Sequence, residues 1–415
     1  MIDKGFQWHR LFPGARLRRR PRPGALARAG LAAGLAAALA LAAFAGAEMT
    51  MAQDRPAPAQ GGETAAPAAA ALPELELDDR VIPLGGALKN PELWAAFKAR
   101  FVTDQGRVVD TANGMISHSE GQGYGMLLAV AANDREAFER IWGWSRANLM
   151  VRDDKLQAWR WDPDKRPGVG DMNNATDGDI LTAWALAEAG EYWNNEAYKV
   201  EARRIAVEVG RKTVLFKTRW GALLLPSVYG FGAEQRPDGP VVNVSYWVFP
   251  AFPRLYLVAP EIDWKGVSRT GMELLAKSRF GAAQLPTEWI SARSSTLKPA
   301  EGFPQNFGYN AIRIPLYMAW AGLGGRSDYE PYVRMWSGRR AAGVVDTRTG
   351  VTQAMGESGY DAIAALTLCA VNGERVPADF LQPRAHENYY PAILHLLSVV
   401  AVQMRYPQCL GENRR

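Results

Sequence analysis

The feature that most constrains the fold is a succession of about eleven apolar segments with helical periodicity between residues 91 and 405. They cover residues 91–103, 126–132, 135–149, 179–193, 196–214, 247–259, 263–278, 310–323, 328–338, 360–371 and 389–405. Several are apolar almost all round, which a helix requires only when neighbours cover it on both sides. We expect one all-α domain of antiparallel helix pairs stacked in a ring, because so many short helices exceed what one bundle core uses.

Strand signals are few in the loops between these segments, which are rich in Gly, Pro and Asn. There is no run of alternating strand patterns and no βαβ spacing, so a doubly wound sheet or a TIM-type barrel is disfavoured. A few minor short strands are expected, for example near "RWGALLLPS", residues 219–227.

The first 47 residues have the pattern of an export signal. "RLRRRPRPGALAR" supplies a charged region, and residues 29–47 supply an apolar one. Cleavage is expected after Ala47, or as late as Ala52. The alternative is a retained anchor, but Ala and Gly are weakly lipophilic. We therefore expect a periplasmic or secreted protein without stable membrane insertion after signal removal, with a Pro/Ala-rich linker and lead-in at 53–89 and the folded domain at 90–415.

The net charge of +5 belongs to the N-terminal tail rather than to the folded domain. Residues 1–28 contain eight Lys or Arg and one Asp, a net +7, so the other 387 residues together carry −2. A partner such as nucleic acid or an anionic membrane requires a basic patch on the folded domain. We exclude both classes of partner, and we expect a monomer.

Only two cysteines occur, Cys369 and Cys409. In an oxidising compartment they can form one disulfide, whereas the apolar surroundings of Cys369 also suit a buried free thiol, so both readings stay open. Their number excludes a zinc-finger-like site, and the four histidines show no ligand pairing. We expect no metal and no cofactor.

The segment "SEGQGYGM", residues 119–126, places one carboxylate beside three glycines at the head of a helical run. A nucleotide loop is a poor interpretation, because no Lys-Ser/Thr follows and Glu120 would repel phosphate. A sugar site fits better: glycines would let the backbone approach a bulky ligand, and apolar neighbours would keep Glu120 protonated as a general acid. The simpler alternative is that Ser119 and Glu120 cap a helix that begins around Gly123.

A second acidic cluster, "NNATDGDI" at residues 173–180, supports the sugar site, since a glycosidase needs two carboxyl groups facing one bond. Asp177 and Asp179 again stand at the head of a helix. Taken alone they suit helix capping, and the spacing of an EF-hand loop is missing. Trp159 and Trp161 lie in a nearby loop, where indole rings can stack on the C–H faces of sugars.

These segments, with "AFKARFVTDQGRVVD", "WRWDP", "NVSYW" and "GYNAIRIPLYMAW", resemble glycoside hydrolase family 8 over residues 90–400, notably endoglucanases associated with bacterial cellulose synthesis. The resemblance implies an (α/α)6 barrel and endo-hydrolysis of a β-1,4-glycan, usually cellulose, with inversion at the anomeric carbon. It also implies a functional link to a cellulose synthase complex. Rival readings are a chitosanase, a mixed-linkage β-glucanase and a non-catalytic glycan-binding relative.

Residue roles follow from the same resemblance. Glu120 matches the proton donor, and Asp177 matches a central carboxylate that is sometimes assigned as a second catalytic residue. Ser245, Tyr246 and Arg313 fall on positions that resemble the family's substrate-cleft residues. The other candidates for substrate binding are Tyr124, Trp159, Trp161, Asp179 and Asn310.

The chain departs from the family pattern at one position, because Asn310 stands where many members have the Asp that activates water. An amide has no useful basicity, so Asn310 can orient a water molecule but cannot take its proton. Glu301, Glu288 and Asp177 are the candidates for the base, and a solvated loop charge is the alternative for both glutamates.

Overall fold

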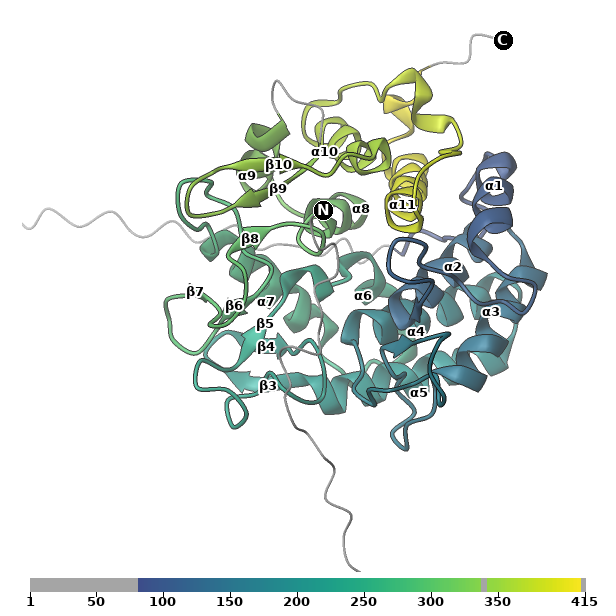
Figure 1. The fold of residues 1–415 in the computed structure, drawn as a ribbon, viewed down its shortest axis with the longest axis horizontal. Coiled ribbons are helices and arrows are strands. Elements are labelled where there is room, and N and C mark those ends of the chain that lie inside the picture. The colour runs from purple at the N-terminus through teal and green to yellow at the C-terminus, as the bar shows by residue number, and fades with distance from the viewer. Residues whose placement is uncertain (1–80, 337–341, 412–415) are drawn as a thin grey trace, which may run out of the picture. The chain divides into compact units, whose positions relative to one another are not determined.

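The computed structural model describes residues 81–336 and 342–411, and eleven α-helices lie in these two stretches (Figure 1). They are α1 (Pro91–Phe101), α2 (Ser119–Ala131), α3 (Arg135–Asn148), α4 (Thr176–Tyr192), α5 (Glu196–Thr213), α6 (Phe252–Val258), α7 (Trp264–Lys277), α8 (Arg313–Ala321), α9 (Arg326–Trp336), α10 (Asp361–Asn372) and α11 (Tyr389–Arg405). Each coincides with a segment whose periodicity predicted a helix, apart from residues at the ends. The largest differences are at α2, which begins at Ser119 although its predicted segment was 126–132, and at α6, which begins at Phe252 although its predicted segment was 247–259.

The helices form inner and outer layers. Helices α2, α4, α8 and α11 are buried around almost their whole circumference, because apolar residues cover all of their faces. Helix α2 packs on α4, and α4 packs on α6. The 3-10 turn at Phe249–Ala251 links α6 to α8, α8 packs on α10 and α11, and α11 returns to α2, which closes the circuit. Helices α1, α3, α5, α7 and α9 have exposed polar faces and pack outside it (Figure 1). The fold is an (α/α)6 barrel, as the sequence predicted.

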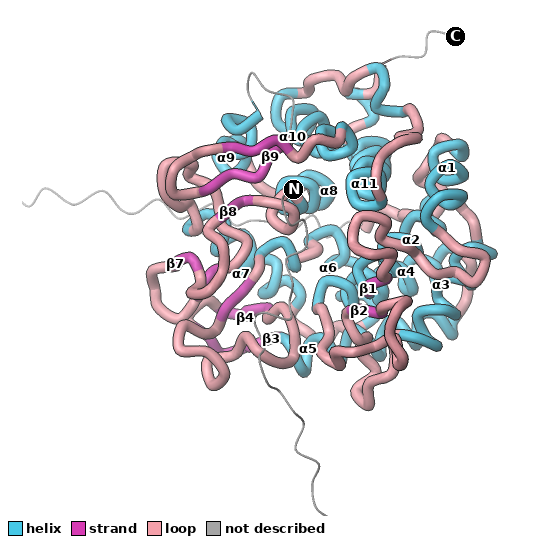
Figure 2. The backbone as a smooth tube through the Cα atoms, in the orientation of Figure 1, coloured by secondary structure: helices cyan, strands magenta, loops and turns pink. Residues whose placement is uncertain are grey.

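Ten short strands in the described stretches pair into four small antiparallel sheets. They are β1 (Ser117–His118) with β2 (Arg160–Trp161); β3 (Val214–Thr218) with β4 (Gly221–Leu224); β5 (Val241–Val242), β6 (Ile290–Ser291) and β7 (Lys298–Pro299); and β8 (Asn306–Phe307), β9 (Gly343–Asp346) and β10 (Thr352–Ala354). The predicted strands near residues 219–227 are β3 and β4. The longest connections run from α5 to α6 and from α7 to α8 (Figure 2).

The segment before α1 is part of the folded unit. Leu84, Ala87 and Leu88 are buried, and the Leu84 amide donates a 3.2 Å hydrogen bond to the carboxylate of Glu188. The folded unit therefore starts before Asn90, where the sequence placed its boundary. The predicted signal (1–47) and most of the predicted linker (53–80) lie outside the described residues. Of the helices in the described stretches, none has both the length and the apolar character needed to cross a membrane.

A disulfide joins Cys369, near the end of α10, to Cys409 in the C-terminal turn, with their Cα atoms 6.0 Å apart. Of the two readings that the sequence left open, the disulfide is the one present. It fastens the C-terminal segment to a helix 40 residues away in sequence.

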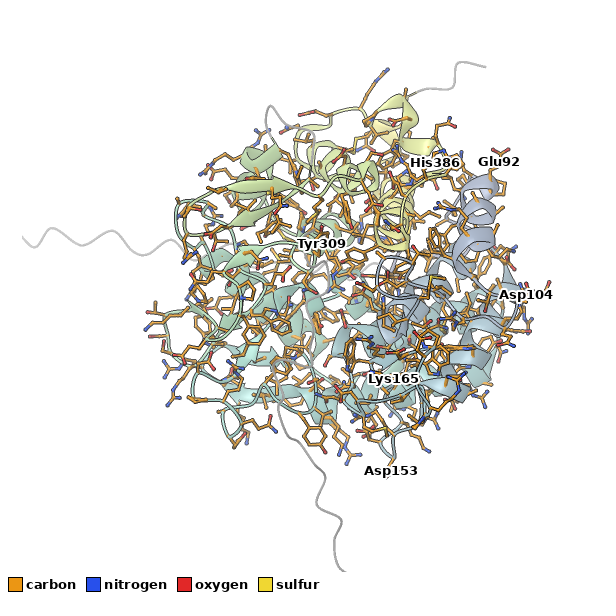
Figure 3. The ribbon with its side chains drawn as sticks, viewed as in Figure 1. Glu92, Asp104, Asp153, Lys165, Tyr309 and His386 are labelled. Carbon is orange, nitrogen blue, oxygen red and sulfur yellow. A yellow bond between two sulfur atoms is a disulfide. The ribbon has the colours of Figure 1, made fainter. Side chains whose placement is uncertain are left out.

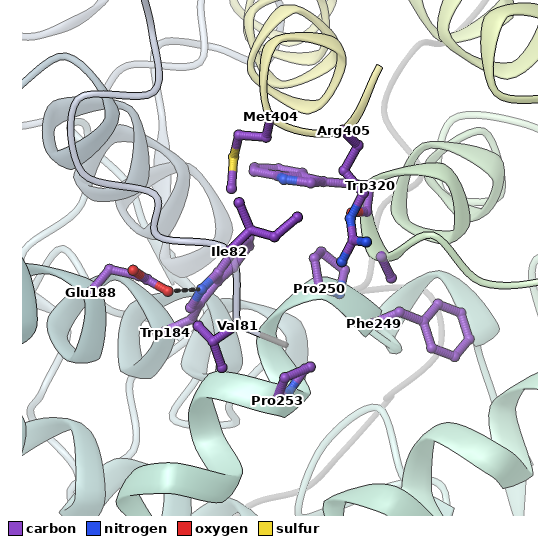
Figure 4. Close-up of a pocket in the computed structure, with 11 residues that line it drawn as sticks. Val81, Ile82, Trp184, Glu188, Phe249, Pro250, Pro253, Trp320, Met404 and Arg405 are labelled. Atoms are coloured by element: carbon purple, nitrogen blue, oxygen red, sulfur yellow. Dashed lines mark hydrogen bonds between the residues drawn. The ribbon is translucent and has the colours of Figure 1, made fainter. Parts of the chain in front are cut away.

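Side chains fill the end of the barrel at which α4, α8 and α11 finish. Trp184, Trp320 and Met404 enclose a cavity of about 30 Å³ there, together with Val81 and Ile82 from the N-terminal segment (Figure 4). That volume has room for about two water molecules. A sugar ring therefore has no place at this end of the barrel.

Candidate active site

The two acids singled out by the sequence lie at the opposite end, where inner helices begin. Glu120 is the second residue of α2, and Asp177 is the second residue of α4. Arg313 opens α8, and Tyr389 opens α11. Helix N-termini carry a partial positive charge that favours carboxylates. The barrel thus gathers its reactive groups at one end.

Glycines bring the starts of α2 and α4 into contact. A Cβ atom on Gly178 would lie 2.1 Å from Ser119 Oγ and 2.8 Å from the Glu120 nitrogen, and one on Gly123 would lie 2.6 Å from Leu181 Cβ. The glycines of "SEGQGYGM" are all buried. The expectation that they make room for a ligand is wrong, because they make room for neighbouring helices and side chains. Their effect is to set Glu120 beside Asp177.

Arg313 joins the acids to two further side chains. Its Nη1 contacts the carboxylate of Glu120 and lies 2.8 Å from Asp177 Oδ2. Its Nη2 donates to Ser245 Oγ at 3.0 Å and to Asn310 Oδ1 at 3.2 Å. The guanidinium is completely buried. A fixed fork of donors therefore determines where each carboxylate sits.

Glu120 has the properties of a general acid. Burial raises its pKa to about 7; the charge of Asp177 adds to the rise, and that of Arg313 opposes it. The side chain is still 17% exposed, so a ligand can reach it. A carboxyl group with such a pKa carries its proton in a useful fraction of molecules near neutral pH.

Four residues that the sequence placed at the substrate surface lie beneath it instead: Tyr124, Asp179, Ser245 and Arg313 are fully buried. The Tyr124 hydroxyl contacts that of Tyr317, and the Ser245 hydroxyl donates to Asn243 at 2.7 Å. Their expected role as direct substrate contacts is wrong in this structure, because protein atoms cover them. Their geometry suits positioning of the acids.

Asp179 shows this most clearly. One of its oxygens accepts the backbone amide of Gln157 at 2.8 Å, and the other accepts the Asn174 side-chain amide at 3.0 Å. Burial raises the pKa of Asp179 to about 7. The group ties the α3–α4 connection to α4 and has no free face toward a ligand.

The predicted tryptophans lie close to Glu120 and are partly exposed. The backbone oxygen of Trp159 accepts the Ser119 amide at 3.0 Å, and Trp161 pairs with Ser117 across β1 and β2. The Trp159 indole donates to Asp171 at 2.9 Å. A sugar ring bound near Glu120 could stack on the partly exposed Trp159, whereas the Trp161 indole is packed by protein: Arg107 lies 5.2 Å from its ring centre and Trp144 meets its ring at 5.5 Å.

Tyr246 is buried and lies against Arg313, whose guanidinium is 5.6 Å from the ring centre. Its ring also meets the edge of Trp289 at 6.3 Å. Tyr246 therefore lies beside the site, where its ring packs against the guanidinium of Arg313.

The two candidate bases on the α7–α8 connection, Glu288 and Glu301, differ in their surroundings. Glu288 is 8% exposed, and its two oxygens accept the backbone and side-chain amides of Asn310 at 2.8 and 3.2 Å. Burial raises the pKa of Glu288 above its usual value. Glu301 is exposed, and its backbone bonds to Asp238 and Arg236 hold it at the surface. Only Glu288 joins the Arg313 network, through Asn310.

Sequence reasoning missed His118 and Tyr317. His118 Nδ1 accepts the Gly121 amide at 3.0 Å as the N-cap of α2, and its Nε2 lies 3.5 Å from Asp110. Although burial lowers it, the pKa of His118 is raised overall by Asp110 and by the charge of Glu120. The position of His118, one residue before "SEG", could have identified it as a site residue from the sequence. Tyr317 lies four residues after Arg313, one helical turn away, and no feature of the sequence marked it as a site residue.

Tyr309 lies on the loop that leads into α8, near the centre of the view down the shortest axis, whereas Glu92 and Asp104 lie at the edge (Figure 3). Its backbone oxygen accepts the Tyr390 hydroxyl at 2.7 Å, which links this loop to the start of α11. In the described stretches, no three His, Cys, Asp or Glu side chains are grouped to hold a metal ion.

The comparisons with known proteins agree with this geometry. The family model of glycosyl hydrolases family 8 matches residues 85–404. A probable endoglucanase of Novacetimonas hansenii is 36% identical over 334 residues, which cover 78% of this chain and 95% of the relative. The solved structure of endo-β-1,4-glucanase CMCax from Acetobacter xylinum is 34% identical with a TM-score of 0.70, over 78% of this chain and 99% of that one. The endoglucanase of Komagataeibacter sucrofermentans is 36% identical with a TM-score of 0.68, over 75% and 96% of the two chains. The chain therefore belongs to family 8 of the glycosyl hydrolases.

Proposed function

We propose that this protein is an endo-acting hydrolase of β-1,4-glucan with cellulose as its substrate. The names of its relatives support this activity, since they are endoglucanases and endo-β-1,4-glucanases. The observation that carries the proposal is the pairing of Glu120 and Asp177 through Arg313, beside two partly exposed tryptophans. Two carboxyl groups and an aromatic surface are what hydrolysis of a glycan requires.

In this proposal Glu120 protonates the glycosidic oxygen and the reaction proceeds by single displacement, with inversion. Asp177 is not the group that activates water. Its oxygen and that of Glu120 contact the same nitrogen of Arg313, so two hydrogen-bond lengths limit their separation to about 6 Å. The carboxyl groups of an inverting pair are roughly 6.5–9.5 Å apart, to leave room for water. Asp177 instead helps to keep Glu120 protonated.

The protein is proposed to act in the periplasm or outside the cell, in connection with cellulose synthesis. The charged and apolar pattern of residues 1–47 supports export. The disulfide between Cys369 and Cys409 agrees with an oxidising compartment.

The test is hydrolysis of cellulose oligomers, carboxymethyl cellulose, chitosan and mixed-linkage β-glucan by the purified protein. We expect a rapid fall in the viscosity of carboxymethyl cellulose and new reducing ends of α configuration, observed by NMR immediately after cleavage. Products of β configuration would indicate retention and would make Asp177 a nucleophile. Faster cleavage of chitosan or of mixed-linkage glucan would mean that this polymer, and not cellulose, is the substrate. Binding without cleavage would identify a non-catalytic relative.

A further inference from the structure

The inverting reaction proposed above requires a second carboxylate that takes a proton from water. We infer that Glu288 is this general base and that Asn310 holds the attacking water in place. The inference rests on the proposed function. It assigns a catalytic role to a residue that the sequence left as one of three alternatives.

The contacts of Asn310 determine its orientation. Its Nδ2 donates to Glu288 Oε2 at 3.2 Å, and its Oδ1 accepts from Arg313 Nη2 at 3.2 Å. Its backbone amide donates to Glu288 Oε1 at 2.8 Å. Both oxygens of Glu288 therefore receive a hydrogen bond, which favours the carboxylate and opposes burial, although burial is the larger effect and raises the pKa of Glu288. A base must be in this charged form to accept a proton.

The backbone that carries Glu288 is held rigidly. The ring of the next residue, Trp289, is stacked between Phe231 at 5.3 Å and Phe303 at 4.7 Å. The Glu288 amide donates to the oxygen of Asn306 at 2.9 Å. Stacking from two loops and a backbone bond from a third segment fix the carboxylate before a substrate binds, as efficient catalysis requires.

The other nearby acids are less suitable. Asp177 is too close to Glu120, and Asp179 is fully buried, so water cannot reach its carboxylate. Glu301 is exposed and is fastened through its backbone to Asp238 and Arg236. Glu288 joins the network of the proton donor through Asn310 and Arg313, and it has a small solvent-facing surface.

The proton balance of the step is complete. The water oxygen bonds to the anomeric carbon while one water proton passes to the Glu288 carboxylate. The bond between the anomeric carbon and the glycosidic oxygen breaks, and its electron pair stays on that oxygen, which takes the proton of Glu120. Exchange with solvent then restores both groups. No other reactant is required.

The test compares Glu288→Gln with Glu120→Gln on cellopentaose and on β-cellobiosyl fluoride, whose leaving group needs no proton. We expect each variant to lose about 10²–10⁴-fold in kcat on cellopentaose. On the fluoride, Glu120→Gln should recover much of the wild-type rate, whereas Glu288→Gln should not. Circular dichroism and Tm would check that both variants fold.

A second variant removes the dependence on one substitution. When Glu288→Ala acts on β-cellobiosyl fluoride with added azide, we expect a cellobiosyl azide of α configuration. The small anion can enter the space that the Glu288 side chain and the attacking water occupy in the wild type. Glu92→Gln, on the exposed start of α1, is the control and should keep the wild-type rate.

Three results would overturn the inference: a folded Glu288→Gln within tenfold of wild type on cellopentaose, recovery of that variant on the fluoride, or no azide product. Loss of activity in Glu301→Gln with an active Glu288→Gln would move the role to Glu301. In each case, inverting cleavage by the wild type would leave the proposed function intact.

Discussion

The Nη1 nitrogen of Arg313 lies 2.8 Å from the Oδ2 oxygen of Asp177, and both side chains are withdrawn from solvent. Each charge is thus compensated only inside the protein. Coulomb attraction in such surroundings is strong, but so is the penalty for leaving one partner alone. The stability of the barrel and the arrangement of its acids therefore depend on the same arginine.

Replacement of this arginine should damage folding as well as catalysis. In Arg313→Met, Asp177 stays buried without its partner, and we expect the free energy of unfolding to fall by about 3–5 kcal/mol. Arg203→Met is the control, because Arg203 is half exposed in its pair with Glu261 and should lose less than about 1 kcal/mol. Urea denaturation measures both. A loss below about 1 kcal/mol in Arg313→Met would contradict the argument.

The rate of cleavage should fall as the pH rises through about 7. Glu120 must carry its proton to act as an acid, and burial raises its pKa to about 7, so activity is lost above that value. Glu288 must be ionised to act as a base, so activity is lost as the pH falls through its pKa, which burial also raises. A profile of kcat/KM between pH 4 and 10 would show a narrow bell. A rate that stays constant up to pH 9 would argue against Glu120 as the acid.

A single methyl group at the contact of α2 and α4 should disturb the site. In Gly178→Ala, the new Cβ would lie 2.1 Å from Ser119 Oγ, so the helices must separate, which costs about 1–3 kcal/mol and moves Glu120 from Asp177. The matched control is Gly143→Ala on α3, where nothing lies within 4 Å of the new atom and helix propensity predicts a slight gain. Thermal unfolding and kcat separate the two variants. Equal stability in both would refute the packing argument.

Removal of the disulfide should lower stability and leave chemistry unchanged. The bond closes a loop of 40 residues, for which the chain-entropy model gives about 4 kcal/mol. Cys369→Ser with Cys409→Ser should therefore unfold at a lower temperature than the oxidised wild type, with the same kcat at 25 °C. A reductant should lower the Tm of the wild type and not that of the variant. A large fall in kcat would mean that the bond also shapes the site.

The helices were predictable because their signal is local. Segments such as α4 and α11 are apolar all round, and this pattern alone implies burial on both sides. Glu120 and Asp177 were found for a similar reason, since acids at helix starts next to glycines are visible in short stretches of sequence. The position of the tryptophans beside Glu120 followed from the same local reading.

The remainder depends on contacts between residues distant in sequence. Arg313 meets Glu120 across 193 positions and Asp177 across 136, and no short segment contains that relationship. Burial of Tyr124 and Asp179 depends on which helix covers them, so a surface role was assigned to side chains that lie inside. The glycines were misread for the same reason, because the neighbour that requires them is another helix.

The filled end of the barrel determines how a polymer can approach. Trp184, Trp320 and the segment containing Val81 leave only about 30 Å³ there, so no chain can be threaded along the barrel axis. A glucan must instead bind across the end of the barrel where the inner helices begin, with both ends of the glucan chain in solvent. An enzyme with such an entrance needs no chain terminus to begin work, and cuts in the middle of a long polymer are the natural outcome of its architecture.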